Sequence, residues 1–276
     1  MTHPLETKRI GFVGCGAMAR ALAGGLLASG VPAEKMYGTD VDPAQRESFE
    51  ASLAVASGPD SARLVAESDV VVLCVKPGVV LNVLENLKDQ PDLQRPLWIS
   101  IAAGIRIATL ESGLPPGARI IRTMPNTPAL VGAGASVLCP NSNADEADEA
   151  VAEALFAAVG STWRAPNEAL MDPVTGLSGS GPAYLFLFLE GLVEAGISQG
   201  LPAQAALALA LQTTFGAAKL ALEDGRSPAE LRAQVSSPGG TTLAGLAQLD
   251  LSDLKGALDR AVGAAAERSR ELSGES

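Results

Sequence analysis

Residues 9–19 read RIGFVGCGAMA, and this stretch decides the predicted fold. An apolar strand pattern over residues 9–13 is followed at once by a glycine turn and then by a helical pattern. Gly14 and Gly16, with Ala19 at the third position, match the G-x-G-x-x-G/A pattern. Because the match lies between a strand and a helix, it predicts a dinucleotide-binding turn. The pattern alone leaves open a strand-to-helix turn without a ligand.

Each residue of this turn has a predicted role. Gly14 permits the tight turn, and Gly16 lets a pyrophosphate approach the backbone. The amides of Ala17 and Met18 face the anion from the first turn of the helix. Cys15 is expected there because it is small, and not as a nucleophile.

Strand patterns recur along the first part of the chain, at residues 35–39, 70–75, 97–101, 120–124 and 136–139. Helical stretches lie between most of them, and residues 143–146 look like a capping box that opens a helix to Val159. The alternation predicts an α/β, Rossmann-type doubly wound parallel sheet.

After Trp163 the strand patterns stop, and alanine-rich helical segments continue to the end of the chain. We therefore expect an NAD(P)-binding Rossmann domain at 1–164 and an all-α domain at 165–276. Segments 185–192 and 205–211 are apolar on nearly every face. A small helical domain cannot cover both alone, so an intertwined homodimer is predicted.

Composition narrows the class of protein. The net charge of −11 argues against nucleic acid and anionic membranes as partners. No apolar run reaches the about 18 residues of a membrane span. Cys15, Cys74 and Cys139 form no CxxC pair, which favours a reduced, cytoplasmic protein without a disulfide or zinc framework. The single histidine, His3, lies at the terminus, so no histidine base, triad or histidine-bound metal is expected.

Asp40 follows the second predicted strand, about 20 positions beyond the glycine turn, where an acidic residue usually meets the adenosine ribose. A carboxylate there favours NADH, although the nearby Arg46 complicates the preference. The alternative is a solvated loop aspartate.

Other small or polar segments end the later strands, at residues 75–77, 102–104 and 125–128. Each alone is more often an ordinary turn, but together they predict a floor for the nicotinamide ring. Two glycine-rich stretches, 176–184 (GLSGSGPAY) and 236–242 (SSPGGTT), precede helices. They predict a carboxylate cradle, with plain capping loops as the alternative.

These segments together make the chain resemble the pyrroline-5-carboxylate reductases. Matches run through residues 12–19, 75–77, 102–104 and 126–128, and the strongest are 176–184 and 236–249. The resemblance implies a Rossmann domain with a helical dimerisation domain, and larger rings of dimers in many members. It also implies hydride transfer from NADPH or NADH to the imine of 1-pyrroline-5-carboxylate, which gives proline.

The resemblance and the Rossmann pattern together assign the site residues. The predicted cofactor-binding residues are Val13, Gly14, Cys15, Gly16, Ala17, Met18, Asp40, Val75, Lys76, Pro77, Ala102, Ala103 and Asn126. The substrate is assigned to Ser237, Gly240, Thr241 and Thr242, and Thr242 is the catalytic residue that hydrogen-bonds the ring nitrogen.

The absence of the usual acid side chains is consistent with an imine substrate. A carbonyl reductase normally supplies a histidine, lysine or tyrosine acid. The chain has no lysine between Lys88 and Lys219, and Tyr184 is followed four positions on by Phe188 instead of lysine. This pattern disfavours a 3-hydroxyacid or F420-type oxidoreductase. A sensor or scaffold without turnover is the remaining alternative, and the complete loop 236–242 opposes it.

Two departures from the family pattern concern the cofactor. Many members have serine or asparagine where this chain has Asp40, and a family asparagine falls near Asp60-Ser61, where there is none. Both changes weaken a 2′-phosphate site. We expect NADH to serve at least as well as NADPH, with the preference left to measurement.

Overall fold

The computed structural model describes residues 4–274, which form two compact units. The first unit holds the chain up to Ser180 together with the residues from Ala264 onward, and the second is Gly181–Gly263. His3 lies outside the described residues. The functional division at residue 164 stays a prediction, because the compact units are divided at other positions.

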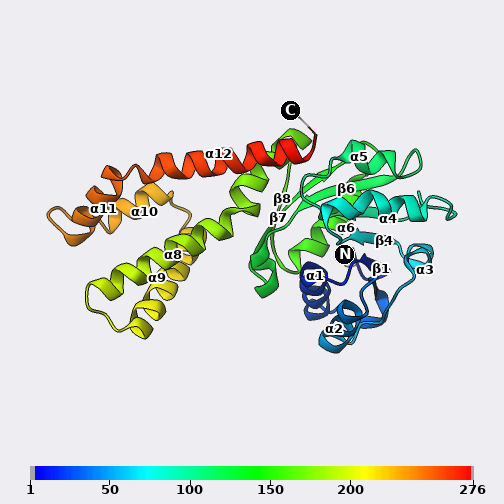
Figure 1. The fold of residues 1–276 in the computed structure, drawn as a ribbon, viewed down its shortest axis with the longest axis horizontal. Helices are drawn as coiled ribbons and strands as arrows, with labels where there is room; N and C mark the ends of the chain where they lie inside the picture. The colour runs from blue at the N-terminus through cyan, green and yellow to red at the C-terminus, as the bar shows by residue number, and fades with distance from the viewer. Residues whose placement is uncertain (1–3, 275–276) are drawn as a thin grey trace. The chain divides into compact units, whose positions relative to one another are not determined.

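Within the described residues, the first unit contains a sheet of eight strands in the order β3-β2-β1-β4-β5-β6-β7-β8 (Figure 1). The strands from β3 to β6 are parallel in the order of a Rossmann fold, which confirms the predicted class. The strands are β1 Ile10–Val13, β2 Met36–Thr39, β3 Ser57–Gly58, β4 Val70–Leu73, β5 Leu97–Ser100, β6 Arg119–Met124, β7 Gly134–Pro140 and β8 Gly160–Arg164.

Helices cover both faces of this sheet. The residues of β4 alternate between two cores: Val70 and Val72 pack with α1, α2 and α6, whereas Val71 and Leu73 pack with α3, α4 and α5. The α-helices of this unit are α1 Ala17–Ala28, α2 Pro43–Leu53, α3 Ser61–Glu67, α4 Val80–Leu87, α5 Ile107–Ser112, α6 Glu146–Ala157 and α7 Met171–Val174. Shorter 3-10 helices are η1 Ala33–Lys35, η2 Pro77–Val79, η3 Thr127–Val131 and η4 Glu168–Leu170.

Three features of this unit differ from the sequence-based expectations. β7 runs antiparallel to β6, so the sheet is mostly and not wholly parallel. The elements β3, α3 and β8 were not predicted. The capping box of α6 begins at Asp145 and is closed by Asp148, instead of lying at residues 143–146.

The predicted helices of the second part are confirmed. They are α8 Gly181–Ser198, α9 Ala203–Asp224, α10 Pro228–Gln234, α11 Thr241–Leu251 and α12 Leu254–Leu272, and the last turns of α12 belong to the first unit. A capping box between Ser227 and Glu230 opens α10, with Pro228 in its first turn.

Helices α8 and α9 pack against each other (Figure 1). Both helices leave large apolar side chains exposed. The side chains of Leu187 and Phe215 are 70% and 62% exposed. Among the described residues, α9 is the one helix that is long and apolar enough to span a membrane by length and composition, a feature that the sequence analysis overlooked. Apolar exposure on this scale indicates a surface that another chain or medium covers.

Candidate active site

The glycine turn has the geometry that a dinucleotide requires. Gly14 has a φ of +103°, and a Cβ added there would lie 2.7 Å from the carbonyl oxygen of Cys74. A Cβ added at Gly16 would have no protein atom within 4 Å, so the backbone is open to a ligand at this point. Gly16 also begins α1 without a side-chain cap, which leaves the first amides of the helix free for an anion. The residues present therefore fit a bound pyrophosphate.

The carboxylate of Asp40 is tied to the same turn. It accepts hydrogen bonds from the amide of Cys15 at 2.9 Å and from the amide of Asp42 at 2.9 Å. Arg46 donates to the carbonyl oxygen of Asp40 at 2.6 Å. The sequence placed Asp40 near the adenosine end, and the structure adds that its carboxylate holds the backbone of the glycine turn.

The thiol of Cys15 is not suited to nucleophilic chemistry. Its side chain is buried, and burial together with the nearby Asp40 raises the pKa of the thiol to about 12. The thiol therefore stays protonated near neutral pH, and the thiolate needed for attack is scarce. This agrees with the expectation that Cys15 is present for its size.

The other predicted cofactor residues gather at one edge of the sheet. Val75-Lys76-Pro77 follow β4, Ala102 and Ala103 follow β5, and Asn126 follows β6. Since β1, β4, β5 and β6 are parallel neighbours, their carboxyl ends meet at the same edge, where α/β folds bind ligands. The structure thus brings these residues together with the glycine turn.

Asn126 has a structural task that the sequence did not reveal. Its side-chain nitrogen donates to the carbonyl oxygen and hydroxyl of Ser178, at 3.2 and 3.3 Å. Its side-chain oxygen accepts from the amide of Ala135 at 2.8 Å. Asn126 therefore fastens the glycine-rich stretch to the end of β6, and its assignment as a cofactor ligand stays a prediction.

Part of the glycine-rich stretch is a π-helix, Thr175–Gly179, a form often found at functional sites. A Cβ at Gly179 would lie 2.3 Å from the terminal methyl group of Met124. This glycine packs closely against the side chain at the end of β6, and the carboxylate cradle expected in this stretch stays a prediction.

A cavity of about 290 Å³ was missed by the sequence analysis and lies beyond the end of β2. Val41, whose side chain is 94% exposed, lines it together with Asp60 and Ser61. Asp60 also caps α3 by accepting from the amide of Arg63 at 3.0 Å. In the sequence, the signal that could have located this cavity is an apolar residue, Val41, between the acids Asp40 and Asp42.

The predicted substrate residues form one loop in the second unit. The amide of Gly240 donates to the carbonyl oxygen of Ser237 at 2.9 Å, and Gly239 has a φ of +73°, so the chain turns tightly there. Gly240 begins α11 without a side-chain cap, and Thr241 and Thr242 are its first helical residues. Exposed hydroxyls beside free helix amides suit an anionic group. The cofactor and substrate sets thus belong to different compact units.

Comparison with known proteins identifies the family. Residues 168–272 match the model for pyrroline-5-carboxylate reductase dimerisation, and residues 9–104 match the model for NADP oxidoreductase, coenzyme F420-dependent. The pyrroline-5-carboxylate reductase of Arabidopsis thaliana is 44% identical over 98% of this chain and 97% of its own. The chain belongs to the pyrroline-5-carboxylate reductase family.

Other members of the reductase family agree over the full length. The enzyme of Methanosarcina acetivorans is 42% identical over 97% of this chain and 99% of its own. The solved reductase of Coxiella burnetii is 38% identical, with a TM-score of 0.92 over 97% of this chain and 99% of its own. That of Plasmodium falciparum, solved with NADP bound, is 32% identical, with a TM-score of 0.86 over 97% and 99%. Because these reductases match both halves, the F420-type alternative is not supported.

Proposed function

We propose that this protein is a pyrroline-5-carboxylate reductase, which uses NADH or NADPH to reduce the imine of 1-pyrroline-5-carboxylate to proline. The observation that carries the proposal is the match at about 40% identity over nearly the whole chain, through both the glycine turn and the Ser236–Leu249 segment. A scaffold without turnover would have no need of a complete substrate loop.

The Rossmann unit supplies the cofactor half of the site. The first amides of α1 hold the pyrophosphate, and Gly16 leaves room for it. Ala102 and Ala103 present small side chains where the nicotinamide ring is to lie. When bound, NAD(P)H supplies the hydride that the protein itself lacks.

The loop at the start of α11 supplies the substrate half. The amides of Thr241 and Thr242 and the hydroxyl of Ser237 hold the substrate carboxylate. The Thr242 hydroxyl donates to the ring nitrogen when it is neutral and accepts from it when it is protonated. When the carbon of the protonated imine receives the hydride, the product is the neutral amine; an imine that enters neutral also takes up one proton from water. A strong protein acid is unnecessary because a cyclic imine is basic, so positioning is the main contribution of the protein.

A test of this assignment compares Thr242→Ala with Thr242→Ser. The alanine variant is expected to lower kcat/KM for pyrroline-5-carboxylate by about a hundredfold, the scale of one lost catalytic hydrogen-bond donor. The Kd for NADH should stay within twofold, about the precision of a fluorescence titration. The serine variant keeps the hydroxyl and should recover most of the activity. A comparable loss of cofactor affinity in Thr242→Ala would contradict the division into two half-sites.

We further propose that NADH serves at least as well as NADPH. Two carboxylates, Asp40 and Asp60, lie where the adenosine end is to bind, and each repels a 2′-phosphate. Asp40→Asn removes one charge and is expected to raise the NADPH/NADH ratio of kcat/KM by about tenfold. The control is Asp42→Asn, which loses the same charge at the cap of α2. A steep preference of the native enzyme for NADPH would refute the proposal.

For assembly and location, we propose a cytoplasmic homodimer that can build larger rings of dimers. The match to the dimerisation model covers α8 to α12, the elements with the exposed apolar side chains, and supports a homo-oligomer. The negative net charge repels nucleic acid and anionic membrane surfaces, so we propose neither as a partner. Light scattering of the purified protein tests both the dimer and the ring.

A further inference from the structure

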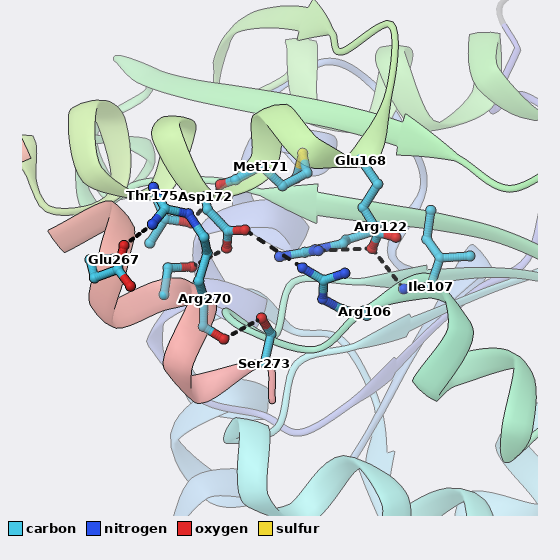
Figure 2. Close-up of polar contacts among 11 residues, drawn as sticks. Arg106, Ile107, Arg122, Glu168, Met171, Asp172, Thr175, Glu267, Arg270 and Ser273 are labelled. Carbon is cyan, nitrogen blue, oxygen red and sulfur yellow. Dashed lines mark hydrogen bonds and ion pairs between the residues drawn. The ribbon is translucent and has the colours of Figure 1, made fainter. Parts of the chain in front are cut away.

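A short segment after β8 places two carboxylates against guanidinium groups, that of the buried Arg122 and that of the half-buried Arg106. Glu168, at the start of η4, accepts from the guanidinium of Arg122 at 2.8 Å and from the amide of Ile107 at 2.8 Å (Figure 2). Arg122 lies in β6 and is only 2% exposed, so the carboxylate of Glu168 compensates a positive charge that is buried in the protein. The amide of Ile107 opens α5, whose own N-cap residue, Arg106, provides no side-chain cap. Glu168 therefore caps α5 from another element.

Asp172, one turn further on, makes a second connection. It is 3% exposed and accepts from the hydroxyl of Ser269 in α12 at 2.6 Å. Its other oxygen forms an ion pair with the guanidinium of Arg106 (Figure 2), with the two atoms 3.9 Å apart. Asp172 thus joins the end of α12 to the residue that precedes α5.

Both connections converge on the loop between β5 and α5. This loop, residues 101–106, contains Ala102 and Ala103, and Gly104 adopts a φ of +73° within it. A Cβ at Gly104 would lie 3.4 Å from the Cβ of Leu272, so the last turn of α12 rests on the loop. Glu168 fixes the far end of the loop through α5, and Asp172 fixes the helix that covers it.

We propose that Glu168 and Asp172 are positioning residues for the cofactor, and that they hold the β5–α5 loop so that Ala102 and Ala103 support the nicotinamide ring. The inference rests on the proposed function for the role of those two alanines. Each of the two ion pairs has one buried member, Arg122 in the first and Asp172 in the second. Such pairs are rigid, because breaking one leaves a buried charge uncompensated. Both acids act through the loop.

The test compares Glu168→Gln with Asp148→Asn. Asp148 is a matched control: it is 6% exposed and pairs with Arg119 at 2.6 Å, but Arg119 stands at the amino end of β6, away from the ligand edge. Both variants should lower the melting temperature. Only Glu168→Gln is expected to raise the Kd for NADH, by about tenfold, since the loop then loses a charge-assisted hydrogen bond.

The Kd is measured by fluorescence titration without substrate, so the result does not depend on turnover. Failure of the proposed function would appear separately, as no reaction with pyrroline-5-carboxylate. Ser269→Ala is a milder second variant that removes one neutral donor, and it should raise the Kd by about threefold. The proposal is overturned if Glu168→Gln, or Ser269→Ala where Glu168→Gln does not fold, binds NADH as tightly as Asp148→Asn does.

Discussion

At Gly16, a side chain would interfere with cofactor binding but not with folding. Gly16 has an extended backbone, with φ −69°, and no protein atom would contact a Cβ there. Gly16→Val should therefore leave the melting temperature unchanged. It should raise the Kd for NADH by at least about tenfold, because the side chain occupies the path of the pyrophosphate.

Gly14→Ala is the contrasting variant for that experiment. Its φ of +103° and its closeness to the carbonyl of Cys74 predict a loss of about 1–3 kcal/mol in the free energy of unfolding. Calorimetry measures stability and titration measures affinity. Equal destabilisation by Gly16→Val and Gly14→Ala would contradict this distinction.

The Cys15 thiol leads to a prediction about pH. Its pKa is raised to about 12, so the thiol is protonated at every pH below that value and the thiolate fraction grows only as pH approaches it. Alkylation of Cys15 by iodoacetamide at pH 8 should be much slower than that of a free cysteine, and Cys15→Ala should keep its activity. Mass spectrometry of the alkylated protein follows the reaction. Rapid, stoichiometric modification of Cys15 with loss of activity would disprove it.

At this scale the sequence located the residues that belong to local motifs. Gly14, Gly16 and Asp40 follow from fixed spacings beside a strand. The sequence did not reveal that Glu168 pairs with Arg122, 46 positions away, because only the folded chain brings them together. An acid in a helical segment looks like a solvated surface charge until its neighbours are known.

Among the elements, α6 offers a clean test of a helix cap. The carboxylate of Asp145 accepts from the amides of Ala147 and Asp148, both at 2.9 Å. Asp145→Ala leaves these amides without that partner and should lower the free energy of unfolding by about 1 kcal/mol. The kcat/KM should not change, because α6 carries no predicted site residue. Urea denaturation measures the effect; an unchanged midpoint would show that the cap is unimportant.

Elements with a strong pattern were predicted from the sequence. The strand expected at residues 70–75 is β4, Val70–Leu73, and the helical segments expected after Trp163 are present. The missed strands had weak patterns. β3 consists of two residues, and β8 (GSTWR) is polar and partly exposed. The antiparallel direction of β7 was missed although a signal for it was present. The connection between β6, which ends at Met124, and β7, which begins at Gly134, is shorter than the crossover of about a dozen residues that parallel neighbours need.

For the whole molecule, the exposed apolar faces of α8 and α9 predict which substitutions weaken the proposed homodimer. Phe215→Glu and Leu187→Glu each place a charge on an apolar surface that the homodimer is to bury, which is costly. Each should weaken the dimer by at least about tenfold, as sedimentation velocity would measure. Leu81→Glu, an exposed leucine of α4 in the Rossmann unit, is the control. An unaltered dimer in both helical variants would place the interface elsewhere.

The division of the chain shows where sequence patterns stop being informative. The change from strands to helices near residue 164 is visible in the sequence. The compact first unit nevertheless continues to Ser180, and it also includes the residues from Ala264 onward. That return depends on contacts such as Ser269 with Asp172, which are 97 positions apart. Periodicity reports which faces are apolar, but it does not report which distant face they meet.

We infer that this chain reduces a cyclic imine with a nicotinamide cofactor. The most direct measurement incubates the purified full-length protein with 1-pyrroline-5-carboxylate and NADH, or NADPH, and follows both the nicotinamide absorbance and the formation of proline. We expect a loss of absorbance matched by an equal amount of proline, with NADH at least as effective as NADPH. No loss of absorbance with either cofactor would contradict it.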